Sequence, residues 1–180
     1  RPIYMDSIKG YQTVATGSFI KELTGVNIPN GIFIMIAMMA VASFLLNKTI
    51  LGRYSFAIGS NEEAARLSGV NVIKWKIISY ALCGMMSGFA AWFMTARLNA
   101  AQPSTGAGYE MDAIAACIIG GASMSGGEGS VSGTIIGAFI MSVLINGLRI
   151  MSVPSEWQTV VTGAVVIFAV YVDMLRRKKQ

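Results

Sequence analysis

The chain has 180 residues, of which 54% are hydrophobic and only 13% are charged, and its formal net charge is +5. A soluble domain usually carries about twice this charged fraction, so the composition indicates an integral membrane protein. The chain has no His, which removes the usual general base and the commonest metal ligand. We therefore expect no catalytic residues and no metal site. The basic residues cluster at the ends of apolar runs, so we expect no nucleic-acid partner either.

The apolar runs predict an all-α integral membrane protein, a polytopic bundle of about five transmembrane helices. Residues 1–30 are mixed and polar, and we place them outside the cytoplasm. Residues 31–175 form the predicted transmembrane domain, with a cytoplasmic loop at 47–76, and residues 176–180 form a basic tail. The predicted spans are 31–46, 77–96, 111–124, 131–148 and 157–172, of which 111–124 is short and broken by glycine.

The basic residues predict the topology. Five of the 14 Lys and Arg lie in residues 47–76 and four lie in residues 176–179, and the positive-inside rule puts both segments in the cytoplasm. Two segments on one side need an even number of crossings between them, so 111–124 must count as a crossing. It covers only about 21 Å as a straight helix. A short, broken crossing is tolerated where its backbone faces protein or water, which makes 111–130 the candidate translocation path.

The most polar part of the loop has the signals of a short helix. Ser60 and Glu63 have the spacing of a capping box, two acids at the start suit the helix dipole, and Gly69 is placed to end the helix in a left-handed conformation. A helix of about two turns is marginal in water alone. We therefore expect it to dock on a soluble partner, with a solvated connector as the alternative.

The second candidate region is the polar stretch around the broken span. Its glycine run, residues 120–129, lacks the Lys of a phosphate-binding loop, so we expect no nucleotide site in this chain. Glu110 and Asp112 are interpreted as helix-start acids, although they could also line the outer mouth of a path. Ser123 could offer a hydroxyl to a polar substrate or serve turn chemistry. The candidate path residues are Tyr109, Asp112, Gly120, Gly121, Ser123, Gly126 and Gly127.

Two smaller features concern packing. Gly84 and Gly88 have the G-x-x-x-G spacing that permits close helix contact, and Gly133 and Gly137 are again four residues apart. The pattern is common by chance in glycine-rich spans. The two cysteines, at positions 83 and 117, fall in apolar runs, where buried free thiols are the expectation.

Three blocks of sequence resemble the permeases of bacterial ABC importers for monosaccharides, the ribose, xylose and galactoside group. The first is the loop Gly52–Val72, which includes Asn61-Glu62-Glu63-Ala64-Ala65-Arg66-Leu67-Ser68-Gly69. The second comprises 101–103, 108–116, 120–123 and 126–134, and the third runs from Trp157 through Gly163 to Asp173. Glu63-Ala64-Ala65 with Gly69 also matches the start of the motif by which ABC permeases dock their ATPase, but the later hydrophobic-Pro part of that motif is absent.

The resemblance implies the C-terminal half of a permease with the fold of a type II ABC importer, in the cytoplasmic membrane of a bacterium. Its partners would be an ABC ATPase, a second permease subunit, an extracytoplasmic sugar-binding protein and membrane lipid. ATP and Mg would bind to the ATPase, so this chain would need no cofactor and would not be an enzyme. The implied ATPase-coupling residues are Asn61, Glu62, Glu63, Ala64, Ala65, Arg66, Leu67 and Gly69.

Two alternatives remain at this point. A branched-chain amino acid permease has a similar fold, although the amino-acid sequence of residues 61–69 argues against this alternative. A membrane scaffold without transport would tolerate bulky side chains in residues 120–129.

Overall fold

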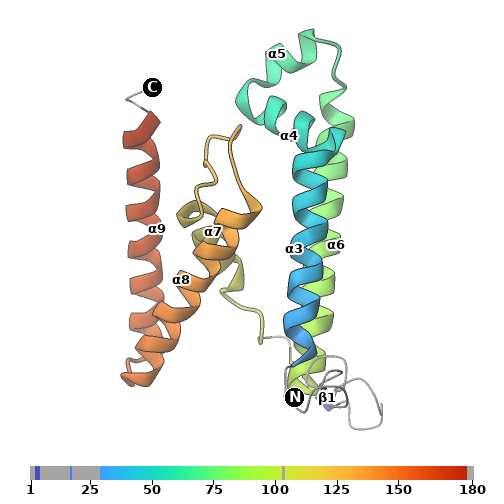
Figure 1. The fold of residues 1–180 in the computed structure, drawn as a ribbon. Helices are drawn as coiled ribbons and strands as arrows, with labels where there is room; N and C mark the ends of the chain where they lie inside the picture. Colours follow the sequence, from blue (N-terminus) through green and yellow to red (C-terminus); the bar gives the residue numbers. More distant parts are fainter. Residues whose placement is uncertain (1–2, 5–16, 18–28, 103, 178–180) are drawn as a thin grey trace. The chain divides into compact units, whose positions relative to one another are not determined.

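The computed structural model describes residues 3–4, 17, 29–102 and 104–177, and most of the predicted extracytoplasmic segment 1–30 lies outside them. The described part is almost entirely helical, which confirms the all-α prediction. Its two strands, β1 (Ile3–Tyr4) and β2 (Ala100–Ala101), pair antiparallel over two residues each. The helices are α3 (Asn30–Lys48), α4 (Ile50–Ser60), α5 (Glu62–Leu67), α6 (Val72–Leu98), α7 (Tyr109–Ile119), α8 (Val131–Ile150) and α9 (Ser155–Arg177) (Figure 1).

Four of the described helices are long and apolar enough to cross a membrane: α3, α6, α8 and residues 155–175 of α9. They coincide with four of the five predicted spans. Helix α6 begins earlier than predicted because Asn71 caps it, the Asn71 side chain accepting a hydrogen bond from the backbone N–H of Lys74 at 3.1 Å. Lys74 and Lys76 therefore belong to the first turns of the helix and not to a loop.

The remaining predicted span, residues 111–124, is shorter than expected. Helix α7 has 11 residues, about 16 Å of axial length, and it ends five residues before the predicted end at 124. The chain turns there because Gly121 has a φ of 88°. The N–H of Ala122 bonds to the carbonyl of Cys117 and that of Gly121 to the carbonyl of Ile118, both at 2.9 Å, which is the crossed pair of a Schellman motif.

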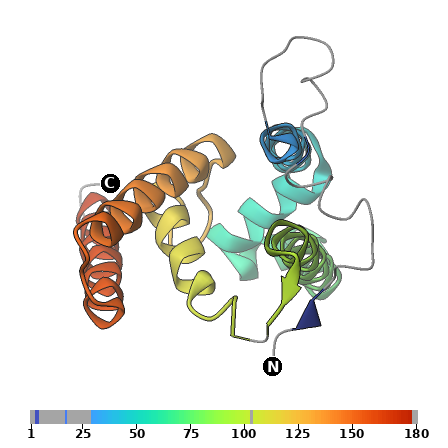
Figure 2. The ribbon, with the colours of Figure 1, turned by 90° about the horizontal axis from the view of Figure 1, so that it is seen from below.

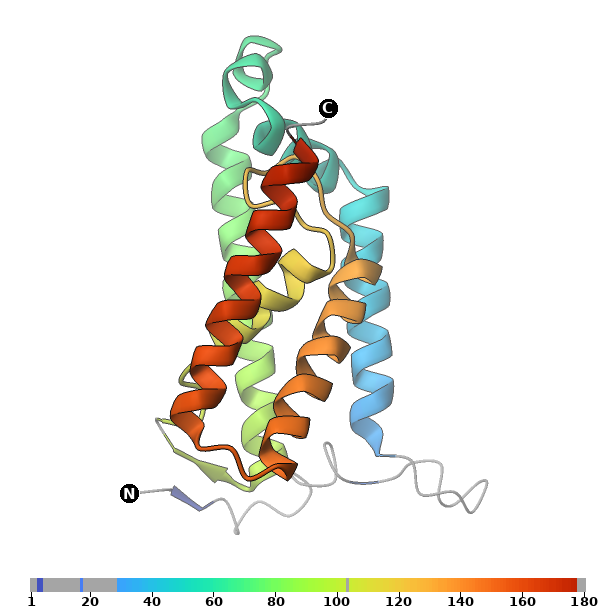
Figure 3. The same ribbon diagram turned by 90° about the vertical axis from the view of Figure 1, so that its left-hand side faces the viewer.

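The chain divides into two compact units, residues 1–42 with 76–107 and residues 43–75 with 108–180. In the second unit α7 packs against both α8 and α9 (Figure 2). Helices α8 and α9 run in opposite directions, joined by a short turn (Figure 3). The small core of this unit consists of Ala115, Ala116 and Met141, with Ile119, Leu144, Ile145, Val165 and Val166 packed against it.

Glycines on α8 determine how closely α7 approaches. A Cβ at Gly133 would collide with the carbonyl oxygen of Gly120, and one at Gly137 would collide with that of Ala116. The same spacing on α6 has no such role, because nothing lies within 4 Å of the position of a Cβ at Gly84 or Gly88 among the described residues. The G-x-x-x-G pattern therefore marks a close helix contact on α8 and not on α6.

Candidate functional site

Helix α5 is the short helix that the sequence predicts, but its cap is one residue further along. Ser60 is the last residue of α4, a helix that is not predicted from the sequence. Asn61 is the true N-cap: it has extended backbone, and its side chain accepts a hydrogen bond from the N–H of Ala64 at 3.0 Å. The predicted Ser60–Glu63 capping box is therefore wrong. The reason is that α4 incorporates Ser60, so that Asn61 is the first residue free to adopt the extended cap conformation.

The end of α5 agrees with the prediction. Gly69 has a φ of 84°, a conformation that L side chains rarely adopt. The N–H of Val70 bonds to the carbonyl of Ala65 and the N–H of Gly69 to that of Arg66, both at 3.1 Å, again the two bonds of a Schellman motif. The Ser68 hydroxyl also donates to the carbonyl of Ala64 at 2.9 Å. A helix of six residues is thus held by specific contacts at both ends.

The outer surface of α5 mixes one apolar side chain with charges. Leu67 is 83% exposed, whereas Ala65 is buried on the opposite side of the helix. Glu62, Glu63 and Arg66 line a shallow recess on the exposed surface. The exposed surface of α5 thus combines one apolar side chain with three charged ones.

Helix α4 fixes the position from which α5 projects. The chain turns at Thr49, whose hydroxyl donates to the carbonyl of Leu45 at 2.6 Å. Gly52 is buried against the carbonyl of Leu46, where a Cβ would collide. The ring of Tyr54 on α4 meets that of Trp75, in the first turn of α6, edge to face, with centroids 5.0 Å apart. The loop predicted at 47–76 is therefore a structured element.

The glycine run 120–129 touches the end of α4 directly. A Cβ at Gly126 would lie 2.6 Å from the carbonyl oxygen of Gly59, and a Cβ at Gly127 would lie 3.1 Å from the Cα of Ser60. Gly126 and Gly127 also have φ values of 87° and 84°. Bulky side chains therefore do not fit at these two positions.

The same run also contacts α9. The Ser123 hydroxyl donates to the Asp173 carboxylate at 3.2 Å and accepts from the N–H of Ser125 at 3.3 Å. The end of α4, the run 120–129 and the last turns of α9 therefore lie at one end of this unit. Asp173 is not among the site residues predicted from the sequence, where its signal is an isolated acid at the end of an apolar run.

The candidate path residues do not form one group. Tyr109 and Asp112 are in the first turn of α7, whereas the glycines and Ser123 follow its last turn, about 16 Å away along the helix. Glu110 caps the start of α7 by accepting a hydrogen bond from the N–H of Gly108 at 3.1 Å, which agrees with its interpretation as a helix-start acid. Whether these residues line a path stays a prediction.

The described residues contain no group of three or more His, Cys, Asp and Glu side chains that could hold a metal ion. Both cysteines are free thiols, and Cys83 is exposed rather than buried as expected. Cys83 lies on α6, whose surface is largely uncovered within this chain.

Residues 3–170 match the family described as "Branched-chain amino acid transport system / permease component". The chain belongs to this permease family. The permease chain is 48% identical to the ribose import permease protein RbsC of Escherichia coli K12 (85% of this chain, 47% of the relative). It is 45% identical to the xylose transport system permease protein XylH of Haemophilus influenzae (84% and 40%). It is 42% identical to RbsC of Bacillus subtilis (94% and 50%).

The permease chain thus spans about half the length of the curated relatives it matches. No solved structure matches it.

Proposed function

We propose that this chain is part of the permease subunit of an ABC-type importer that carries a monosaccharide across a bacterial cytoplasmic membrane. Membership of the permease family and four apolar helices of spanning length support a multi-pass membrane protein. The family description mentions branched-chain amino acids, but the relatives at 42–48% identity are named for ribose and xylose. A sugar is therefore the favoured cargo, and an amino acid is the competing one.

Helix α5 is proposed to dock on a separate ATPase subunit, which would bind ATP and Mg. The observation that carries this assignment is Leu67, 83% exposed on a short helix with specific contacts at both ends. Because the ends of α5 are fixed, the helix can bear a load without unwinding. Glu62, Glu63 and Arg66 would supply the polar rim around the leucine.

Movement of α5 is proposed to reach the spanning helices through the glycine run 120–129. The run contacts Gly59 and Ser60 at the end of α4, and Ser123 in the run bonds to Asp173 on α9. Close-packed backbones transmit displacement rather than absorb it. ATP-driven motion of α5 would thereby shift α7, α8 and α9, in a pathway shared with a second permease subunit and supplied by an extracytoplasmic sugar-binding protein.

The proposed orientation puts α5 and the basic tail in the cytoplasm. Lys48, Arg53 and Arg66 accompany α4 and α5, and the chain after α9 is also basic. The contact between Ser123 and Asp173 supports this orientation because it joins the tail end of α9 to the run that touches α4.

The test compares Leu67→Ala with Met151→Ala in the full-length permease, assembled with its ATPase in membrane vesicles. Both changes truncate a highly exposed apolar side chain, but Met151 lies in the turn between α8 and α9. ATP-dependent uptake of radiolabelled ribose, xylose and leucine is measured together with co-purification of the ATPase. We expect Leu67→Ala to lower sugar uptake at least about tenfold, as the loss of an interface anchor does, and to weaken ATPase retention.

Met151→Ala should leave both measurements within about twofold. Unchanged ATPase retention and uptake in Leu67→Ala would remove the coupling assignment. Uptake of leucine in place of ribose and xylose would move the cargo to the amino acid alternative.

A further inference from the structure

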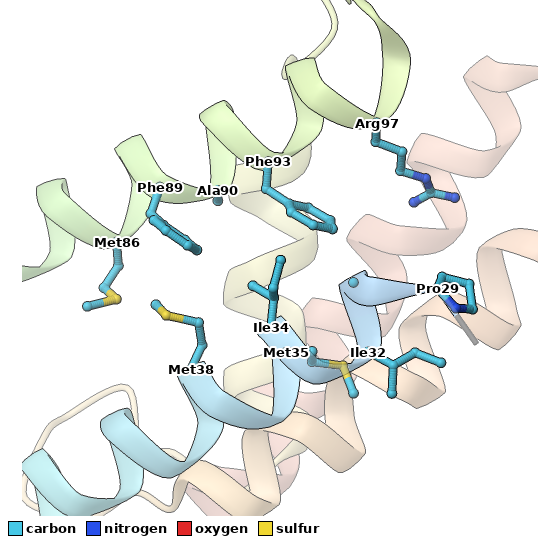
Figure 4. Close-up of a pocket in the computed structure, with 11 residues that line it drawn as sticks. Pro29, Ile32, Ile34, Met35, Met38, Met86, Phe89, Ala90, Phe93 and Arg97 are labelled. Atoms are coloured by element: carbon cyan, nitrogen blue, oxygen red, sulfur yellow. The ribbon is translucent and has the colours of Figure 1, made fainter. Parts of the chain in front are cut away.

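The first unit contains an apolar groove between α3 and α6, with a volume of about 680 Å³ (Figure 4). Met86, Phe89 and Phe93 on α6 point across it toward the isoleucine and methionine side chains of α3. The full lining is Pro29, Gly31, Ile32, Ile34, Met35, Met38, Met86, Phe89, Ala90, Phe93 and Arg97. Every lining residue is apolar except Arg97, which stands at one end.

The lining decides what class of ligand the groove can take. A monosaccharide carries several hydroxyl groups, and burying them without hydrogen-bond partners costs about 1–3 kcal/mol each. Among the described residues that line the groove, only Arg97 has a polar side chain for that purpose. A long hydrocarbon needs no such partners, and methionine side chains adapt readily to an irregular apolar ligand.

The length and charge of the groove fit one leaflet of a bilayer. Met86 and Arg97 are 11 residues apart on one continuous helix, which is about 16 Å along the axis. Half of the ~30 Å hydrocarbon core is about 15 Å. Arg97 is in the last turn of α6, one residue before its end, where a side chain can reach the headgroup layer.

We propose that this groove binds an anionic phospholipid, with one acyl chain along α3 and α6 and the phosphate on Arg97. A guanidinium can make two parallel hydrogen bonds to phosphate oxygens. Zwitterionic headgroups carry the same phosphate together with a cation, and the repulsion between that cation and Arg97 gives the end of the groove a preference for anionic headgroups. The bound lipid joins the start of α3 to the end of α6, because Pro29 and Arg97 lie at the same end of the groove (Figure 4).

The experiment measures lipid retained by the purified full-length permease in detergent, by native mass spectrometry, after titration with phosphatidylglycerol or phosphatidylcholine. We expect phosphatidylglycerol to be retained about fivefold better, because Arg97 repels the choline cation of phosphatidylcholine. Arg97→Gln should abolish the preference and Arg97→Lys should keep most of it. Arg149→Gln is the matched control, since Arg149 is also the basic residue in the last turn of a spanning helix, α8, but lies outside the groove.

A second pair of variants tests the hydrocarbon part. Ala90→Trp fills the groove, whereas Ala91→Trp places the same ring on the exposed neighbouring position of α6, outside the lining. We expect only Ala90→Trp to lower lipid retention, by about tenfold.

Four results would overturn the proposal. Equal losses in Arg97→Gln and Arg149→Gln would mean general charge attraction, and full retention in Ala90→Trp would mean that lipid lies elsewhere. Displacement of the lipid by ribose or xylose, or equal retention of glycerol phosphate alone, would assign the groove to a different ligand. None of these results affects the proposed transport function, whose test depends on Leu67 and not on Arg97.

Discussion

The helix α8 and the helix α6 carry the same glycine spacing and have opposite surroundings. On α8, Gly133 and Gly137 lie against the backbone of α7, so that no side chain fits. On α6, Gly84 and Gly88 face open space within the described chain, and the helix instead lines a groove with phenylalanine and methionine. The spacing therefore permits close approach but does not create it. Whether the two backbones approach closely depends on the presence of a second helix, which on α8 is α7.

The largest expected effect tests this comparison directly. Gly137→Leu forces a side chain into the carbonyl of Ala116, and because the obstacle is backbone, we expect a loss of ~3 kcal/mol or more in stability. Gly88→Leu is the matched change on α6 and should alter stability by less than about 1 kcal/mol. Thermal unfolding of both variants in the same detergent, followed by tryptophan fluorescence, measures the difference. Equal destabilisation would show that α6 is packed as tightly as α8.

A smaller effect is expected at the contact between the glycine run and α4. Gly126→Val requires a β-branched residue at a φ of 87° and against the carbonyl of Gly59, so the contact should open. Gly106→Val is the control, because nothing lies within 4 Å of a Cβ there. We expect trypsin to cleave after Arg66 about 5- to 30-fold faster in Gly126→Val, which corresponds to a local loss of ~1–2 kcal/mol. The same cleavage rate in both variants would mean that the run does not support α4.

Much of the fold follows from the sequence, because four apolar runs of sufficient length leave the chain little choice. The helix ends were predictable where one residue determines them, as Gly69 does. The cap at Asn61 was not predictable, because it depends on where α4 ends, and the mixed sequence of α4 has no clear periodic pattern of apolar residues. The end of α7 was placed too late because the predicted span continued through Gly120 and Gly121 to residue 124, whereas the helix ends at Ile119 and Gly121 has a positive φ.

The site was predictable in its parts and not in its connections. Residues 61–69 stand out as a polar, capped segment, and the glycine run 120–129 stands out by composition. The contacts of that run with Gly59 and with Asp173 join residues 50 or more positions apart. No local pattern encodes such pairs, because they arise only when α7, α8 and α9 are packed together.

The central claim is that α5 and the basic tail lie on the cytoplasmic side of one membrane, with the turn between α8 and α9 on the other. Cysteine labelling tests it most directly, in a full-length permease whose Cys83 and Cys117 are replaced by Ser. Leu67→Cys, Gln180→Cys and Met151→Cys are each exposed to a membrane-impermeant maleimide in intact cells and in inverted vesicles, both from cells that lack the ATPase, so that the proposed docking surface is uncovered. The account predicts that Leu67→Cys and Gln180→Cys react only in inverted vesicles and Met151→Cys only in intact cells. Labelling of Leu67→Cys and Gln180→Cys from opposite sides would contradict it.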